Sequence, residues 1–503
     1  MSKLRAESSK DTQFIQSFEV TNGGTSGDLI SQKREQRPLK VGLLATAYFE
    51  YYRMYDGLYE KVCENMQKIA DAIFPFCDLV YPGVVDTLDK SREAGLLFRR
   101  EGVEAIIIAE GTYSVDYLVH QALLEVSEDM PLLLFGSQSH STLDFNAGYA
   151  ASLLNSGPMG IVQFACSLHK MKRFTKYEVV IGCIDDSEVL EEIKGYIKIR
   201  KAIRDLHYMN IGLVGHIFRG MYDFQYDKTD LTGKLGPHVM DIDIKHLMKI
   251  YQEIPFEDER VVKIMQEAKE NYQVAEEIST LDLQRAARLG AALSKLIEQY
   301  KLDGLALLGQ HFIETETQTT SYVGVANILS KDQAIVVTEG DVLGLILSSV
   351  MKEVSGVTPF FGEWEEVDTN LNAVIVLGHG FIDPRAARKD RPVKLGCSCE
   401  EWGWEGQAPG FEATLEPGPA TLAAIISHGD TWKILISEGE IPDTPALEIN
   451  ESTVVVQMEE KIRDYYRHVV EMGFGHHVMV VPGHIGRALE MFARQKGFEI
   501  CKP

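Results

Sequence analysis

The chain of 503 residues is too long to fold around one hydrophobic core, and its length suggests two or three domains. Hydrophobic residues make up 45% of it and charged residues 25%, a balance typical of a globular protein. Its formal net charge of −24 argues against a nucleic-acid or anionic-membrane partner, because neutralising phosphates requires clustered Lys and Arg side chains.

The sequence also predicts where the protein resides. No apolar run approaches the roughly 20 residues that a membrane helix needs, and the N-terminus lacks the apolar core of a signal peptide. Seven cysteines at scattered positions fit a reducing compartment better than a disulfide scaffold. We therefore expect a cytoplasmic protein. Residues 1–38 are polar, and we expect them to form an extension outside the folded core.

Regular patterns begin at Leu39 and predict a first α/β domain over residues 39–176. Strand-like apolar runs lie at 41–46, 103–109 and 131–135, and apolar residues recur at helical spacing from Leu58 to Ile73. Alternation of this kind predicts a parallel sheet with helices on both faces.

A second α/β domain is predicted over residues 177–355. Its strand-like runs lie at 179–184, 211–214 and 303–308, and a long amphipathic helix is expected over roughly 281–300. Each of the two units is Rossmann-like in its alternation of strands and helices.

The C-terminal part, residues 356–503, has a different texture. Short β-rich runs such as 423–427 and 432–437 are punctuated by prolines, which is typical of an antiparallel sheet or small barrel. The predicted fold class is therefore α/β, with two Rossmann-like parallel-sheet domains followed by a β-rich, barrel-like domain.

Metal-competent side chains follow several of these strands. The strand-like runs 334–338, 358–362 and 373–378 precede Glu339, Glu363 and His379 in turn. A further pair, His476 and His477, stands directly before a β-rich run at 478–481. Two carboxylates with one or two imidazoles would make a site suited to Mn²⁺, Co²⁺ or Fe²⁺.

Simpler interpretations of the same residues remain open. Glu339 opens an apolar helical pattern, so its charge could serve only the helix dipole. Glu365 and Glu366 resemble a solvated charge run, although either could replace Glu363 if the turn is shifted.

In order and approximate spacing these segments resemble the metal-binding stretches of the L-arabinose isomerase family, which forms one superfamily with L-fucose isomerase. The family's Glu-Gly-Asp is matched at Glu339, its Phe-Met-Glu at 361–363, its strand-end histidine at His379, and the second histidine of its His-His pair at His477. The spacing from Glu363 to His379 is one residue shorter than in the family. The resemblance extends over about residues 41–500.

This resemblance implies a metal-dependent aldose–ketose isomerase. Glu339 and Glu363 are then expected to act as acid and base as well as ligands, with His379 and His477 as further ligands and His476 as the substitute. A bound Mn²⁺, Co²⁺ or Fe²⁺ would stabilise an enediolate while a carboxylate moves a proton between two carbons. The family further implies a homo-oligomer, a trimer or hexamer, with sites shared between subunits.

The loops expected to contact the sugar depart from the family. Where the family has Gly-Ser-Gln-His after the first strand, residues 45–48 are Ala-Thr-Ala-Tyr, and residues 136–140 keep a glutamine but move a histidine. We expect sugar contacts from Thr46, Tyr48, Gln138, His140, Phe361 and His476. The substrate is therefore not expected to be L-arabinose. An isomerase or epimerase of another sugar, or a non-catalytic sugar-binding or regulatory protein, remains an alternative.

Overall fold

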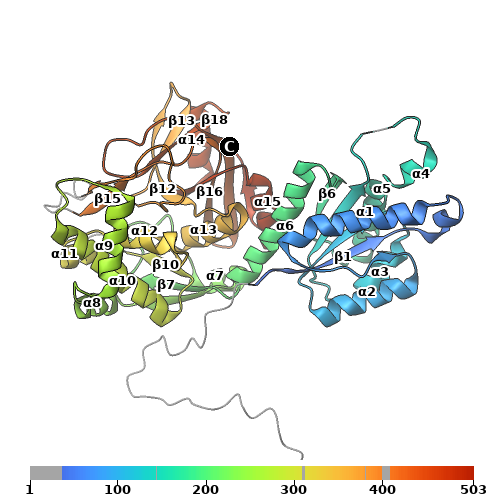
Figure 1. Ribbon diagram of the computed structural model, residues 1–503, viewed down its shortest axis with the longest axis horizontal. Helices are drawn as coiled ribbons and strands as arrows, with labels where there is room; N and C mark the ends of the chain where they lie inside the picture. The colour runs from blue at the N-terminus through green and yellow to red at the C-terminus, as the bar shows by residue number, and fades with distance from the viewer. Residues whose placement is uncertain (1–36, 143, 309–311, 380, 399–407) are drawn as a thin grey trace, which may run out of the picture.

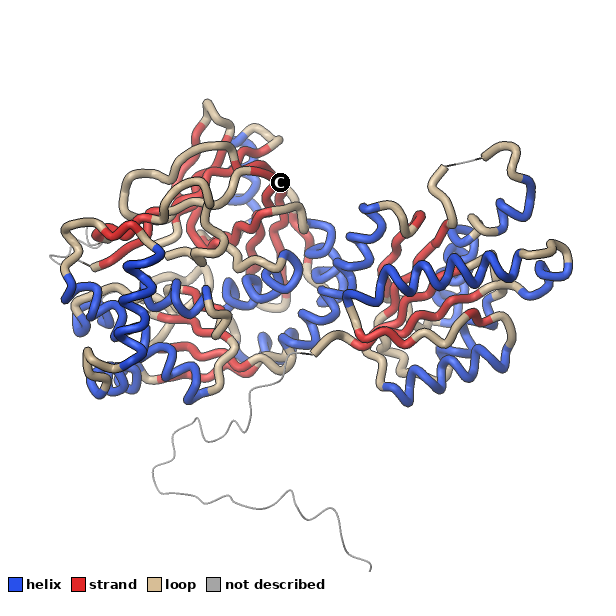
Figure 2. The backbone as a smooth tube through the Cα atoms, in the orientation of Figure 1, coloured by secondary structure: helices blue, strands red, loops and turns tan. Residues whose placement is uncertain are grey.

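The computed structural model describes residues 37–503, except 143, 309–311, 380 and 399–407. The predicted extension over 1–38 falls almost entirely outside the described residues. Figure 2 shows one group of strands at one end of the molecule and two further groups at the other. Among the described residues, no helix combines the length and apolar character that crossing a membrane would require.

The first sheet is parallel throughout, and its five main strands run in the order β2-β1-β4-β5-β6. A short strand, β3, pairs with the carboxyl end of β1. This is a doubly wound arrangement, as the alternating pattern predicted. The strands are β1 (Lys40–Thr46), β2 (Asp78–Val80), β3 (Val84–Val85), β4 (Ala105–Glu110), β5 (Leu132–Gln138) and β6 (Tyr177–Cys183).

Membership of β6 in this sheet corrects one prediction. The run at 179–184 was expected to begin the second α/β unit, but β6 pairs with β5 over its whole length. A buried parallel strand has the same apolar pattern whichever sheet it joins, so its sequence does not reveal its partner.

Helices cover both faces of the first sheet. One face packs against α2, α3 and α5, and the other packs against α1 and α6. In Figure 1 the long α6 lies between this unit and the rest of the molecule. The helical segments are η2 (Phe49–Arg53), α1 (Leu58–Ile73), η3 (Phe74–Phe76), α2 (Leu88–Glu101), α3 (Asp116–Leu123), α4 (Gly148–Leu153), α5 (Gly157–Met171) and α6 (Ser187–Leu206).

The second sheet is also parallel, in the order β11-β10-β7-β8. Its strands are β7 (Asn210–Val214), β8 (His238–Ile242), β10 (Gly304–Leu307) and β11 (Ile335–Val337). Its helices are α7 (Lys228–Leu235), α8 (Ile244–Glu253), α9 (Glu259–Asn271), α10 (Thr280–Tyr300), α11 (Phe312–Thr317), α12 (Tyr322–Ser330) and α13 (Val342–Ser355). The predicted helix over 281–300 is α10.

The C-terminal region contains a closed antiparallel barrel, which confirms the β-rich prediction. Six strands close in the order β16-β19-β12-β13-β18-β17, with β17 returning to β16. They are β12 (Phe360–Asp368), β13 (Ala373–Leu377), β16 (Gly418–His428), β17 (Thr431–Ile441), β18 (Thr453–Met458) and β19 (His477–Pro482). The remaining elements are β9 (Gln273–Val274), β14 (Lys394–Cys397), β15 (Pro409–Glu412), α14 (Ile462–Met472), α15 (Gly486–Lys496) and β20 (Glu499–Cys501).

The carboxyl end of β4 buries one acidic side chain, Glu110, which is 1% exposed. The Ser114 hydroxyl lies 3.4 Å from one carboxyl oxygen, and the other, Oε2, has no hydrogen-bond partner among the described residues. Gly160 in α5 permits this packing, because a Cβ there would lie 1.7 Å from Oε2. Burial raises the pKa of Glu110 well above its usual range.

We expect Glu110→Gln to raise the free energy of unfolding by about 1–3 kcal/mol near pH 7.5, and to change it little near pH 4. The pKa of Glu110 in the folded protein lies above its value of about 4.3 in the unfolded chain. The free energy of unfolding therefore decreases as the pH rises from the unfolded-state pKa to the folded-state pKa. Glutamine keeps the shape but cannot ionise. Urea denaturation at both pH values measures the effect, and an equal gain at both would contradict ionisation as its cause.

Candidate metal centre

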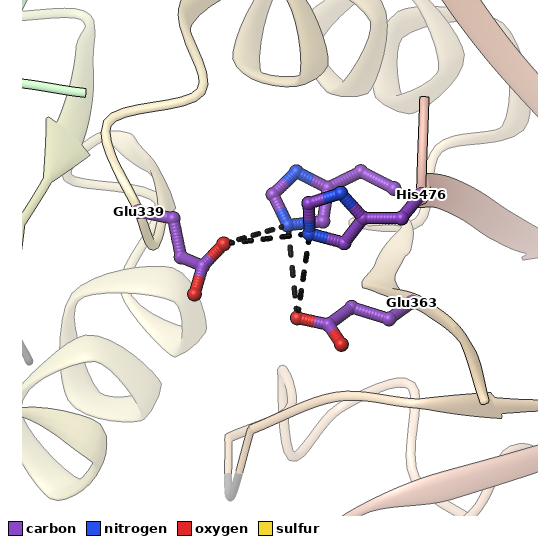
Figure 3. A group of neighbouring side chains, drawn as sticks. Glu339, Glu363 and His476 are labelled. Carbon is purple, nitrogen blue, oxygen red and sulfur yellow. Dashed lines mark ion pairs between the residues drawn. The ribbon is translucent and has the colours of Figure 1, made fainter. Parts of the chain in front are cut away.

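Four side chains meet between the second sheet and the barrel. One ligand atom from each of Glu339, Glu363, His476 and His477 lies within 4.8 Å of every other. Figure 3 shows the two carboxylates directed towards the pair of imidazoles. Glu339 and His477 are buried, and the other two are partly buried. Such a set of oxygen and nitrogen donors, screened from solvent, is chemically suited to Mn²⁺, Co²⁺ or Fe²⁺.

The backbone at the end of β11 is folded tightly to place Glu339. Glu339 has a φ of 60° and Gly340 a φ of 73°, in the left-handed region that glycine tolerates best. A Cβ at Gly340 would lie 2.7 Å from the His216 carbonyl oxygen, so the neighbouring loop also requires glycine there. The Phe218 amide donates to the Glu339 carbonyl at 2.9 Å. A left-handed conformation at a glutamate is uncommon, and such residues often occur at functional sites.

Strand register brings the second carboxylate to the imidazoles. Glu363 in β12 is paired directly opposite His477 in β19, so their side chains share one face of the barrel wall. The Trp364 amide donates to the His476 carbonyl at 3.0 Å and fixes the next residue of the turn. The sequence suggested that Glu363 follows the end of a strand, but in the structure it lies within β12.

Two aspartates orient the two imidazoles. His477 Nδ1 lies 3.0 Å from Asp341 Oδ2, and His476 Nδ1 lies 2.5 Å from Asp223 Oδ2. A carboxylate only accepts hydrogen bonds, so each Nδ1 carries a proton and each Nε2 is left facing the glutamates. His477 Nε2 is 3.2 Å from Glu339 Oε2, and His476 Nε2 is 3.7 Å from the same oxygen. Both imidazoles thus present the nitrogen that a metal would use.

Sequence reasoning missed both aspartates as functional residues. Asp341 belongs to the Glu-Gly-Asp motif, and it also caps α13 by accepting from the Gly344 amide at 2.9 Å. Asp223 lies in the loop after β7, at the carboxyl edge of a parallel sheet where ligands collect. That position was the available signal. Phe224 beside it stacks on the His477 ring at 4.8 Å between centroids.

The electrostatics keep both carboxylates ionised. Burial acts to raise the pKa of Glu339, but His476 and His477 outweigh it and lower that pKa to about 2. Burial also opposes the lowering of the Glu363 pKa, which His379 causes. Conversely, burial acts to lower the pKa of His477, while Asp341 and Glu339 raise it to about 9. The ionised carboxylates are therefore paired with a protonated His477, and a metal ion would bind in place of that proton.

His379 and Phe361 also lie at this cluster. His379 Nε2 forms a short hydrogen bond with Glu363 Oε1 and lies 3.8 Å from Glu339 Oε1. His379 was predicted as a ligand, but the four residues with mutually close ligand atoms include His476 and not His379. Phe361 is buried, and its ring packs 4.6 Å from that of His477.

The other predicted sugar contacts lie on the first sheet. Thr46 and Gln138 end β1 and β5, which belong to the same sheet, and Figure 1 places β1 at the far end of the molecule from β12. Thr46 is buried and accepts from the Ser114 hydroxyl at 3.0 Å, so it supports the loop behind Tyr48. His140 Nδ1 lies 2.8 Å from the Ser139 hydroxyl. A single chain therefore does not bring these residues to the metal cluster.

Comparison with known proteins gives one informative likeness. Searched against protein-family models, the chain matches none. It is 21% identical over 326 residues to the sulfoquinovose isomerase of Alkalicoccus urumqiensis, a match that covers 63% of this chain and 70% of that protein. This similarity supports a relationship with sugar isomerases, of the kind that includes L-fucose and L-arabinose isomerases, and does not single out arabinose isomerase.

Proposed function

We propose that this protein is a metal-dependent aldose–ketose isomerase, an intramolecular oxidoreductase. The observation that carries the proposal is the cluster of Glu339, Glu363, His476 and His477 within 4.8 Å. The similarity to a sulfoquinovose isomerase supports the reaction class independently of that geometry. The donor set fits Mn²⁺, Co²⁺ or Fe²⁺, because it combines carboxylate oxygens with imidazole nitrogens and no thiolate.

The reaction needs a proton to leave one carbon of the sugar and return to its neighbour. Glu339 and Glu363 are ionised at neutral pH, so either carboxylate can accept that proton and give it back. His379 holds Oε1 of Glu363 by a hydrogen bond, and the same oxygen lies 3.8 Å from His476 Nε2. A bound divalent cation would supply polarisation of the two sugar oxygens and stabilise their developing negative charge.

A turnover assay on a panel of aldoses, with and without Mn²⁺, tests the proposal. We expect ketose formation that chelation abolishes and Mn²⁺ restores. The panel contains L-arabinose, D-galactose, L-fucose, D-arabinose, deoxy aldoses and sulfoquinovose. The last of these is the sugar in the name of the similar isomerase. We expect L-arabinose not to be the best substrate, because residues 45–48 and 136–140 differ from the family's sugar-contacting loops. A sugar hydroxyl that loses its hydrogen-bond partner lowers the rate by about one to two decades.

Each outcome of the panel has a distinct meaning. Full activity after exhaustive chelation would refute metal dependence. A 2-epimer in place of a ketose would assign an epimerase, and sugar binding without turnover would assign a regulatory protein. L-arabinose as the best substrate by more than about a decade would restore the simple family assignment and contradict the argument from residues 45–48 and 136–140.

We further propose that the working unit is a homo-oligomer in which the first α/β unit of one subunit completes the metal site of another. The separation of β1 and β5 from the cluster within one chain supports it. So do the exposed apolar side chains near the carboxyl edge of the first sheet, where Met54, Phe145 and Tyr149 are 64%, 92% and 60% exposed. Large exposed apolar groups that gather on one face often mark an interface.

Mixed oligomers test this arrangement. Gln138→Ala and Glu339→Gln are each expected to inactivate the homo-oligomer, whereas unfolding and refolding the two together should restore part of the activity. Restoration occurs only when one subunit supplies Gln138 and another supplies Glu339. A monomeric mass by light scattering together with full activity would contradict the proposal, as would mixtures that stay inactive.

A further inference from the structure

A second cavity lies away from the metal cluster. It has a volume of about 370 Å³ and opens at the amino-terminal edge of the first sheet, where β5 and β6 begin. Its walls come from the segments before these strands, from α6, and from α15 of the C-terminal region. Figure 1 shows α15 beside α6, and the two helices are in contact. The cavity therefore lies where the first α/β unit meets the C-terminal region.

Hydrogen-bond donors without acceptors line this cavity. Tyr196 is fully buried, yet its hydroxyl has no hydrogen-bond partner among the described residues. Arg200 Nε and Gln495 Nε2 are likewise buried and without acceptors in the described part of the chain. Tyr196 and Arg200 are one helical turn apart on α6 and so face the same side. Arg200 Nη1 donates to Gln495 Oε1 at 2.6 Å, which holds the guanidinium against α15.

The guanidinium of Arg200 forms no close ion pair among the described residues, although the charge of Glu104 acts on it from a greater distance. No ion pair joins Arg200 or the neighbouring Lys496 to a carboxylate of the described residues. Burial, and then the charge of Arg200, lower the pKa of Lys496. Arg494, on the same helix as Gln495, is by contrast paired with Glu178 at 2.8 Å.

The other charged side chains that line the cavity add to its excess of positive charge. Of the acidic groups that line the cavity, Glu128 is paired with Arg173 at 2.9 Å and Glu178 with Arg494. Among the described residues, Asp129 is then the remaining unpaired acid of the cavity lining, compared with three unpaired basic side chains, Arg200, Lys172 and Lys176. In a protein of net charge −24, a cavity of net positive charge with several buried donors indicates an anionic ligand.

We propose that this cavity is a binding site for a small tetrahedral oxyanion, a phosphate, sulfate or sulfonate group carried by a sugar-sized metabolite. The oxyanion would accept hydrogen bonds from Arg200, Tyr196 and Gln495 together, which satisfies all the donors at once. Guanidinium is the cation best suited to such planar recognition. The volume suits a ligand of monosaccharide size. The proposal does not depend on the isomerase reaction.

Isothermal titration of the full chain with inorganic phosphate and with sulfate, at constant ionic strength in chloride, tests the site. We expect saturable binding of one anion per chain and a rise in Tm with anion concentration. Arg200→Gln should weaken binding about tenfold or more, and Tyr196→Phe about threefold to tenfold. The matched control is Arg487→Gln, because Arg487 lies on α15, the helix that supplies Gln495, but pairs with Glu192 at 3.0 Å and does not line the cavity.

The contrasting results are equally definite. Tyr196→Phe removes one oxygen atom and retains the packing of α6, so it remains informative if Arg200→Gln fails to fold. Absence of saturable binding by the wild type would overturn the proposal. So would equal affinity in Tyr196→Phe, Arg487→Gln and the wild type. Titrations with glucose 6-phosphate and with methanesulfonate then decide which kind of metabolite carries the anion, and saturable binding of either supports the site.

Discussion

Glu339→Gln and Glu363→Gln are each expected to lower kcat by about 10²–10⁴-fold while the fold stays intact. Each substitution removes a proton carrier and one negative charge from a buried cluster. The packing should survive, because glutamine has the shape of glutamate and neither residue lies in the hydrophobic core. Turnover of the best aldose in the panel, measured at saturating Mn²⁺, separates a loss of chemistry from a loss of metal.

The control for these variants comes from the same strand. Glu366→Gln makes the same chemical change three residues after Glu363, on an exposed side chain. We expect it to retain wild-type turnover. The comparison also tests the alternative that Glu365 or Glu366 serves in place of Glu363. Full activity of Glu363→Gln, or loss of activity in Glu366→Gln, would contradict the roles proposed for this strand.

The elements of the fold were largely predictable, and the pairing of strands was not. Apolar runs such as that of β4 identified strands, and the proline-punctuated region after residue 380 indicated the barrel, because burial and turns leave local patterns. The sheet that β6 joins depends on packing against β5, which no local pattern encodes. The domain boundary near residue 177 therefore remains a prediction, although the strand that begins there pairs with β5 of the first sheet.

The candidate site shows the same division. Glu339, Glu363 and His477 could be found because each adjoins an apolar strand-like run in the sequence, although Glu363 lies within β12 in the structure. Asp223 also follows a strand, but its role could not be assigned from that position, since it depends on a contact with His476, 253 residues further along the chain. The choice between His379 and His476 depends likewise on side-chain geometry in the folded barrel.

Metal affinity should respond strongly to the aspartates that orient the imidazoles. We expect Asp341→Asn to weaken Mn²⁺ binding by about 10–100-fold, the usual effect of removing a carboxylate behind a histidine ligand. Asparagine still accepts from the Gly344 amide as a helix cap, so α13 should persist. Isothermal titration with Mn²⁺ measures the change, and circular dichroism checks the fold.

Asp227→Asn is the matched control for this experiment, because Asp227 caps α7 in the same way and contacts no imidazole. It should bind Mn²⁺ as the wild type does, and unchanged affinity in Asp341→Asn would contradict the role assigned to His477. The same substitution at Asp223 then identifies the fourth ligand. If His476 binds the metal, Asp223→Asn weakens binding by a similar factor and His379→Ala changes it less. If His379 binds the metal, Asp223→Asn leaves the affinity unchanged and His379→Ala lowers it, because His379 depends on Glu363 and not on Asp223 for its orientation.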